Sequence, residues 1–320
     1  MFVLRSSRLQ SSSSIRFSLK RRRQRTISTI DTFDRHAFDL NGYVVVRDCV
    51  SKEDIERMNN EIDQRNGIPR DTLGLKNTKE NSYFSAKGSR IDMGGMLSWD
   101  TDVFRSMLTH HRLKPYLESF VGSNYRLDHE PMILLQEKDS EGFRLHGGPI
   151  GSDGALNPEL QYRANSEGFF NSLLAVSIAL SPVHPGDGGL CLLRGSHKST
   201  FRTPDELLDG STKESRHFLD EHLHSPSLSP GDAVLFSEAT VHGAKPWIAE
   251  HQRRVLLMRF SPRTVAYGRS YFDDPEWNGT LERCTPDQAK ILRPPYSSRL
   301  DQRDPEKLLH DKRTFGHEYF

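Results

Sequence analysis

The hydrophobic positions of this chain change their spacing at about residue 124. From there on, short apolar runs alternate with turn residues, among them Pro and Gly. Such a pattern is typical of an all-β sandwich or barrel with short strands. The predicted strands are 131–137, 172–180, 189–193, 232–237 and 254–260.

Before residue 124 the pattern predicts helices more than strands. A turn and a short buried strand are expected over 38–46, and Ser51 is the predicted N-cap of a helix over 51–65. A second helix is expected over 102–120, because its apolar residues form a stripe with helical spacing. Residues 68–100 are rich in Gly, Asn, Lys and Ser and predict a long loop or lid. The predicted class is therefore mainly β with flanking helices.

Charge divides the chain into a basic leader and a slightly acidic remainder. Residues 1–30 carry eight Lys and Arg and no Asp or Glu, with many Ser and scattered apolar residues. This composition predicts an organelle transit peptide, mitochondrial first, with a plastid signal or the basic tail of a cytoplasmic protein as alternatives. The expected division is a transit peptide over 1–30, one β domain over 31–290 and a charged C-terminal extension over 291–320.

Composition excludes several classes of protein. Residues 31–320 carry 36 basic and 43 acidic side chains, which argues against nucleic acid as the main partner. No apolar run reaches the roughly 18 residues of a membrane span. The three cysteines are widely spaced and predict neither a disulfide framework nor a zinc site. The expected partner is a small-molecule substrate. The sequence does not indicate whether the protein is a monomer or an oligomer.

Two histidines and an arginine suggest a metal site. His146 stands in RLHGG, and His242 follows the predicted turn and strand SPGDAVLF, which would carry it to the mouth of a barrel. Arg253 lies eleven residues further on, at the start of the next predicted strand, where a guanidinium could hold a carboxylate by two hydrogen bonds. Two imidazoles beside such a cation suggest a mononuclear iron site, although a carboxylate ligand would also be needed.

Several segments in the same order resemble the phytanoyl-CoA dioxygenase family of iron(II)/2-oxoglutarate oxygenases. The similar region covers about residues 33 to 262, and its pieces are FDLNGYVVV, LHGGP, GDGGLCLLRGSHKS, SPGDAVLF, and VHGAKPW followed by RRVLLMRFSP. The resemblance implies a double-stranded β-helix, a jelly-roll or cupin-like barrel. It also implies that His146 and His242 bind Fe(II) and that Arg253 binds the distal carboxylate of 2-oxoglutarate. Arg254 is the alternative anchor, since adjacent residues of a strand face opposite sides.

Gly148 departs from the family pattern. The metal-binding aspartate of the usual His-x-Asp motif would stand here, and this chain has no side chain at that place. Four outcomes remain open: chloride or bromide fills the position, as in related halogenases; water fills it; an acid such as Asp153 or Glu238 moves in; or the protein has lost iron and acts as a binding protein.

Four further residues are predicted to lie near the site. Gln136 could contact the co-substrate from the strand that leads toward His146. Glu238 lies four residues before His242, so on a regular strand its backbone would be about 13 Å away. It is therefore predicted to contact substrate or the metal ligands and not the metal. His197 is expected to fix its loop, with a role near the substrate as the alternative, and Trp247 is expected either to wall the pocket or to lie in the core.

The expected function is that of a 2-oxoglutarate-dependent dioxygenase. It would hydroxylate a small organic substrate and release succinate and CO2, with Fe(II) as cofactor. The alternatives are a halogenase that uses the position vacated at Gly148, a non-catalytic binding protein and, more remotely, a cupin-like isomerase or lyase.

Overall fold

The computed structural model describes residues 30–66, 78–166, 168–268 and 275–295. The predicted transit peptide, apart from Ile30, and most of the predicted C-terminal extension lie outside the described residues, so this division of the chain stays a prediction. Among the described residues no helix is long and apolar enough to cross a membrane.

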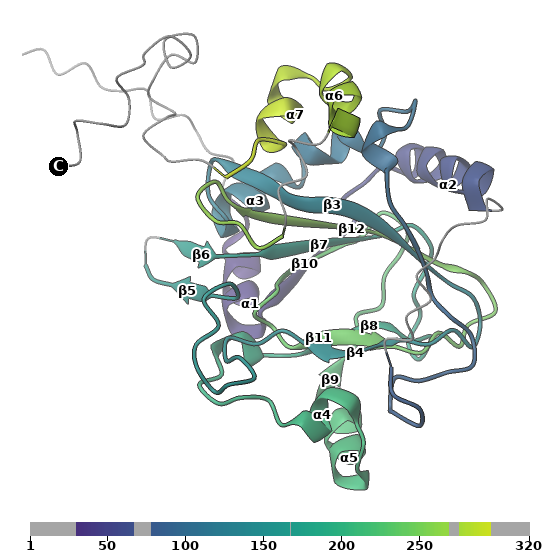
Figure 1. Cartoon of the computed structure of the whole chain (residues 1–320), viewed down its shortest axis with the longest axis vertical. Helices are drawn as coiled ribbons and strands as arrows, with labels where there is room; N and C mark the ends of the chain where they lie inside the picture. Colours follow the sequence, from purple (N-terminus) through teal and green to yellow (C-terminus); the bar gives the residue numbers. More distant parts are fainter. Residues whose placement is uncertain (1–29, 67–77, 167, 269–274, 296–320) are drawn as a thin grey trace, which may run out of the picture.

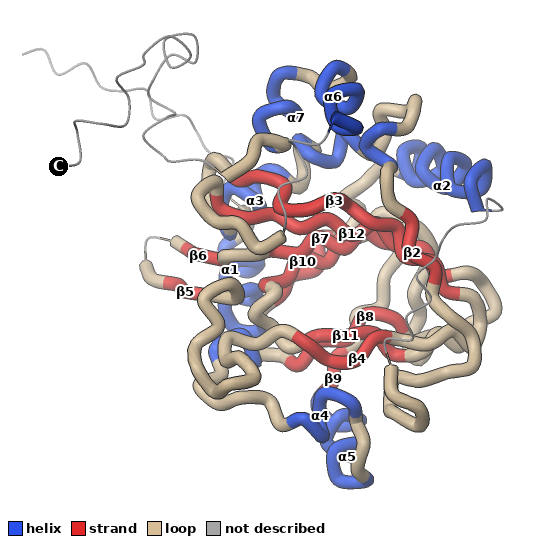
Figure 2. The backbone as a smooth tube through the Cα atoms, in the orientation of Figure 1, coloured by secondary structure: helices blue, strands red, loops and turns tan. Residues whose placement is uncertain are grey.

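Two antiparallel sheets face each other in the centre of the molecule (Figures 1 and 2). The large sheet has the strand order β1-β10-β7-β12-β3-β2, the small sheet has the order β4-β11-β8-β9, and β5 pairs with β6. Strands far apart in sequence are neighbours, as in a jelly roll. This arrangement confirms the predicted double-stranded β-helix. The strands are β1 (Tyr43–Val46), β2 (Ile91–Met93), β3 (Tyr125–Gln136), β4 (Phe143–His146), β5 (Tyr162–Ala164), β6 (Phe169–Asn171), β7 (Leu174–Ala179), β8 (Gly189–Leu193), β9 (Leu223–His224), β10 (Ala233–Ser237), β11 (His242–Lys245) and β12 (Arg253–Pro262).

Helices flank both sheets. Figure 1 shows α6 and α7 on the side of the large sheet away from the small one, and α4 and α5 beyond the small sheet. The α-helices are α1 (Thr32–Asn41), α2 (Lys52–Asn66), α3 (Lys114–Phe120), α4 (Asp205–Asp209), α5 (Lys213–His222), α6 (Pro275–Glu282) and α7 (Pro286–Ile291). The short 3-10 helices are η1 (Met96–Ser98), η2 (Arg105–Thr109) and η3 (Ser196–Lys198).

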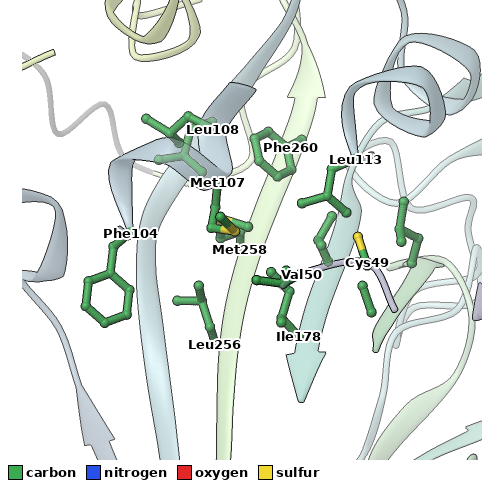
Figure 3. Close-up of a cluster of buried hydrophobic side chains, with 14 of the residues drawn as sticks. Cys49, Val50, Phe104, Met107, Leu108, Leu113, Ile178, Leu256, Met258 and Phe260 are labelled. Carbon is green, nitrogen blue, oxygen red and sulfur yellow. The ribbon is translucent and has the colours of Figure 1, made fainter. Parts of the chain in front are cut away.

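The main hydrophobic core lies on the helix-covered face of the large sheet. The side chains of β12 alternate between this core and the face that looks toward the small sheet. The β12 residues Leu256, Met258 and Phe260 are in that core, together with side chains from η2 such as Met107 and Leu108 (Figure 3). Because side chains alternate along a strand, the intervening positions point between the two sheets. Those positions include Arg253, Leu257 and Arg259, which line an internal cavity.

Two sequence predictions about helices were wrong. The expected helix over 102–120 is broken into η2 and α3, and Pro115 stands in the first turn of α3, where its missing N–H costs nothing. The expected turn at 38–42 is the end of α1, which is capped by the Asp31 carboxylate and terminated by Gly42 at φ +82°. The predicted lid over 68–100 contains β2 and η1, while 67–77 lie outside the described residues.

Candidate metal centre

His146 and His242 lie side by side on neighbouring strands of the small sheet. His146 ends β4 and His242 begins β11, and the two are paired in the register of these strands. Their ring centroids are 4.1 Å apart. The strands can approach closely because Gly243 lies between them: a Cβ on that residue would stand 2.6 Å from the carbonyl oxygen of Phe143. The residues that the sequence predicts as metal ligands are thus brought together by strand pairing.

Hydrogen bonds to the backbone set the tautomer of both imidazoles. Nδ1 of His242 is 2.7 Å from the carbonyl oxygen of Thr240, and Nδ1 of His146 is 3.2 Å from that of Arg144. A carbonyl oxygen can only accept, so Nδ1 carries the proton and donates it. Burial lowers the pKa of both rings, that of His146 to about 3, so both are neutral at pH 7. Each ring therefore presents the lone pair of Nε2, the form of histidine that binds metals.

Glu238 completes a group of three ligand side chains. Its Oε2 lies 3.4 Å from Nε2 of His242, and its Oε1 accepts a hydrogen bond of 2.7 Å from Nε of Arg259. One ligand atom each from His146, Glu238 and His242 lie within 4.8 Å of one another, as metal ligands do. Burial acts to raise the pKa of Glu238, but the charge of Arg259 and its hydrogen bond to the carboxylate help to outweigh it, so the pKa lies below its ordinary value and the carboxylate is charged.

The prediction that Glu238 lies too far from His242 assumed a regular strand, and the strand is not regular. β10 ends at Ser237, and the amide of Thr240 donates to the carbonyl oxygen of Ser237 at 2.8 Å, which turns the chain before β11 begins. The turn brings Glu238 back over His242. The other acid considered, Asp153, is exposed, and its carboxylate accepts from the amide of Ala155.

The chain after His146 takes a path that favours glycine. Gly147 and Gly148 have φ values of +88° and +96°, which side chains of L-residues rarely permit. A Cβ on Gly147 would stand 2.6 Å from the carbonyl oxygen of Glu238, so this backbone lies directly against the turn that carries Glu238. At Gly148 a Cβ would meet Cγ2 of Val241 at 3.4 Å.

A cavity of about 190 Å³ opens between the sheets beside these side chains. Its walls are mainly apolar, with a few charged groups, as is usual for a site that binds a small molecule. The lining includes His146, His242, Arg90, Asp92, Ser177, Arg253 and Arg259, together with Met132, Leu134, Leu190, Phe236 and Leu257.

Arg253 points into this cavity and Arg254 does not. Arg253 is 4% exposed, its Nη1 donates to Oε1 of Gln136 at 2.5 Å, and its Nε has no hydrogen-bond partner among the described residues. Burial and the nearby charge of Arg90 lower the pKa of Arg253 to about 10, so it remains a cation. Arg254 instead pairs with Asp63 of α2 at 2.6 Å. A buried cation with an unused donor matches the needs of a carboxylate ligand.

Gln136, His197 and Trp247 lie outside the lining of the cavity. Gln136 is fully buried and acts on the cavity through Arg253. Nε2 of His197 donates to the carbonyl oxygen of Asp39 at 3.0 Å, which agrees with a loop-fixing role and not with substrate contact. Trp247 is fully buried in a core cluster, and its indole N–H donates to the carbonyl oxygen of His251, so it is a core residue.

Sequence reasoning missed three charged groups of the cavity, Arg90, Asp92 and Arg259. Arg259 has the same strand parity as Arg253, so the alternation of β12 could have indicated it. Arg90 lies in the segment over 68–100, for which the sequence predicts only a loop or lid. It makes two hydrogen bonds to the carboxylate of Asp92, its guanidinium lies 5.0 Å from the ring centroid of Phe143, and no short-range sequence signal indicates that placement.

Comparisons with known proteins identify the family of the chain. The family model described as phytanoyl-CoA dioxygenase matches residues 38–255. The peroxisomal phytanoyl-CoA dioxygenases of Bos taurus and Homo sapiens are 22% and 21% identical to the chain, each over 73% of the chain and 69% of the relative.

Solved structures show the same fold. The structure of HygX from Streptomyces hygroscopicus with nickel and 2-oxoglutarate bound has a TM-score of 0.61 and 19% identity, over 75% of this chain and 90% of HygX. The 2-oxoglutarate-dependent epimerase SnoN has a TM-score of 0.50 and 18% identity, over 76% and 88%. The chain therefore belongs to the phytanoyl-CoA dioxygenase family and is an oxidoreductase of the iron- and 2-oxoglutarate-dependent class.

Proposed function

We propose that this protein hydroxylates a small organic substrate and couples that reaction to the conversion of 2-oxoglutarate into succinate and CO2. The observation that carries the proposal is the placement of Arg253 in the same buried cavity as His146 and His242. The cavity thus offers two neutral imidazole nitrogens and one buried cation, which suit a metal ion and a dicarboxylate that bridges the two positions.

Each group of the cavity has a distinct task in this proposal. Nε2 of His146 and Nε2 of His242 would hold Fe(II), which when bound supplies the activation of dioxygen and the chelation of the 2-oxo acid. Arg253 would bind the distal carboxylate, with its guanidinium held in place by Gln136. The apolar walls exclude water, which strengthens the pairing of Arg253 with a carboxylate.

Hydroxylation is preferred over halogenation because a carboxylate lies beside the histidines. Gly148 does leave its own position without a side chain, but the Glu238 carboxylate is within reach of the two imidazoles. Nothing in the described cavity favours a halide over that carboxylate. A non-catalytic role is disfavoured because Arg253 is buried in the cavity with an unused donor, which a bound carboxylate would satisfy.

Two comparisons bear on the substrate and the outcome. HygX was solved with hygromycin B bound, and SnoN is described as an epimerase. A small organic molecule therefore suits this fold. Oxygen insertion must be tested directly, because SnoN has a similar fold and is described as an epimerase.

The proposal is tested by anaerobic titration of the protein with Fe(II) and 2-oxoglutarate, followed by measurement of succinate after oxygen is added. We expect a charge-transfer band in the wild type and its loss in His146→Ala and His242→Ala. His36→Ala alters an exposed histidine of α1 and serves as the control. Undiminished succinate formation in both site variants would refute the proposal.

We further propose that residues 1–30 direct the protein to mitochondria, because of their basic, acid-free composition. A fluorescent fusion of the full chain should co-localise with mitochondria, and the same fusion without residues 1–30 should not. Peroxisomal staining of the full chain, the location in the names of the curated relatives, would overturn this proposal.

A further inference from the structure

We infer that Glu238 supplies the metal-binding carboxylate that the family places two residues after the first histidine, so that the ligand set of this chain is His146, Glu238 and His242. The inference rests on the proposed function, since it concerns the same metal. It changes the interpretation of Gly148: the glycine marks a carboxylate moved to another segment, not one that has been lost.

The first support is the pairing of two acceptor atoms. Nδ1 of His242 donates to the carbonyl oxygen of Thr240, so in the neutral ring Nε2 carries the lone pair. That lone pair faces Oε2 of Glu238 at 3.4 Å in a buried position. A ligand atom of His146 lies within 4.8 Å of the ligand atoms of both, so the three side chains can share one cation. Such an arrangement of two imidazoles and one carboxylate suits Fe(II).

The second support is the way Glu238 is held. The residue is 5% exposed, and its Oε1 is fixed by the guanidinium of Arg259 while Oε2 points to the histidines. Carboxylates that bind metals commonly have a hydrogen bond on the second oxygen, which orients the first. Arg259 itself projects from β12 into the same cavity.

The third support is the shape of the backbone after His146. The close contact between Gly147 and the carbonyl oxygen of Glu238 requires that residue 147 lack a side chain. The φ value of +96° at Gly148 disfavours an aspartate there. The two glycines and the turn at Glu238 therefore fit one another: the path that excludes the usual carboxylate is the path that admits Glu238.

The test compares metal affinity in full-length variants, measured by anaerobic calorimetric titration with Fe(II) and with Co(II) as the oxygen-stable probe. Glu238→Gln should weaken binding by more than about 10-fold, the low end of what loss of a ligand's hydrogen-bond partner costs. Asp153→Asn removes an exposed carboxylate from the segment after His146 and should stay within about two-fold of the wild type. Circular dichroism spectra of the metal-free variants check that the fold is kept.

Two further measurements separate ligation from mere pairing with Arg259. In Glu238→Ala, millimolar formate should restore much of the metal affinity, because it can replace the carboxylate; a purely structural loss would not respond. In the wild type, chloride or bromide should leave the charge-transfer band of the Fe(II)–2-oxoglutarate complex unchanged. This second measurement needs no variant and decides the matter if the variants fail to fold.

The failures of the two ideas are distinguishable. Wild-type affinity in Glu238→Gln, or a halide-dependent band in the wild type, overturns the assignment of Glu238. If His242→Ala still loses the metal in that case, the proposed function stands. If the wild type binds no metal, or His242→Ala binds it as the wild type does, the proposed function fails as well.

Discussion

Gly189 leaves room for the side chain of Arg253, because the Cβ of any other residue at position 189 would collide with it. A Cβ on Gly189 would stand 2.7 Å from Nε of Arg253, and the glycine has a φ of +78°. The first residue of β8 and the first residue of β12 thus share a space that only glycine allows. The nitrogen concerned is the one that lacks a partner among the described residues, so this contact helps to decide where the free donor of Arg253 points.

Gly189→Ala is expected to weaken 2-oxoglutarate binding by about 10-fold, equivalent to about 1.4 kcal/mol, because Arg253 must shift. It should also cost about 1–2 kcal/mol of stability through the strained backbone. Gly186→Ala is a matched control, because φ is +92° there but nothing lies within 4 Å of the added Cβ. We expect that control to lose stability and keep its affinity for 2-oxoglutarate. Equal affinities in the two variants would show that the contact is unimportant.

Arg253→Gln should raise the dissociation constant of 2-oxoglutarate by roughly 10- to 100-fold, since hydrogen bonds to a charged group contribute about 1.5–3 kcal/mol. Arg254→Gln should leave that constant within about two-fold, because its guanidinium pairs with Asp63 on the other face of the sheet. Isothermal calorimetry with the metal-loaded protein measures both. A larger effect from Arg254→Gln would reverse the assignment.

The stability of the protein should fall as the pH drops from about 6.5 to about 4, in part through His197. Burial lowers the pKa of His197 from 6.5 to about 4 in the folded state. Between these values the unfolded chain takes up a proton that the folded chain refuses, so acid favours unfolding. At pH above 6.5 this contribution to stability is fully present.

His197→Gln should therefore reduce the slope of unfolding free energy against pH in this window, by up to about 1.4 kcal/mol per pH unit. Urea denaturation at pH 7, 6, 5 and 4.5 measures the slope for variant and wild type. Metal affinity at pH 7 should be unchanged, because His197 lies outside the cavity. A variant with the slope of the wild type would contradict the low pKa.

Asp128→Asn should cost about 3–5 kcal/mol of stability, because it leaves a buried guanidinium without its counter-charge. Asp128 is fully buried, pairs with Arg126 at 2.8 Å and accepts from the amides of Tyr267 and Gly268. The control Asp153→Asn alters an exposed carboxylate and should change stability by less than about 0.5 kcal/mol. Guanidinium chloride denaturation measures both, and a loss below about 1 kcal/mol in Asp128→Asn would contradict the role of the pair.

The sequence predicted the strands of the barrel better than its loops. The strand expected over 189–193 coincides with β8, and those over 232–237 and 254–260 overlap β10 and β12. These segments are recognisable because burial on both faces requires continuous apolar runs. The prediction of one helix over 102–120 was wrong because two short helices, η2 and α3, contribute these buried apolar residues. The sequence between the two helices has no strong helix breaker before Pro115, so the break could not be seen.

The placement of Glu238 could not be predicted from spacing alone. The rise per residue of a regular strand gives a distance between Glu238 and His242. The turn over 238–241 depends instead on tertiary contacts, such as the hydrogen bond from the amide of Glu238 to the carbonyl oxygen of Leu173. The choice between Arg253 and Arg254 likewise required knowing which face of β12 the helices cover. Motif order located the cavity, and only packing established which side chains enter it.

The register that pairs His146 with His242 has a consequence for assembly. β4 is the edge of the small sheet, and its pairing with β11 is irregular. The two imidazoles come together only after this edge strand has docked, so the newly made chain has no preformed iron site until the segment through Lys245 has left the ribosome. An ion bound between them would in turn slow the release of β4, which amide hydrogen exchange in this strand would detect.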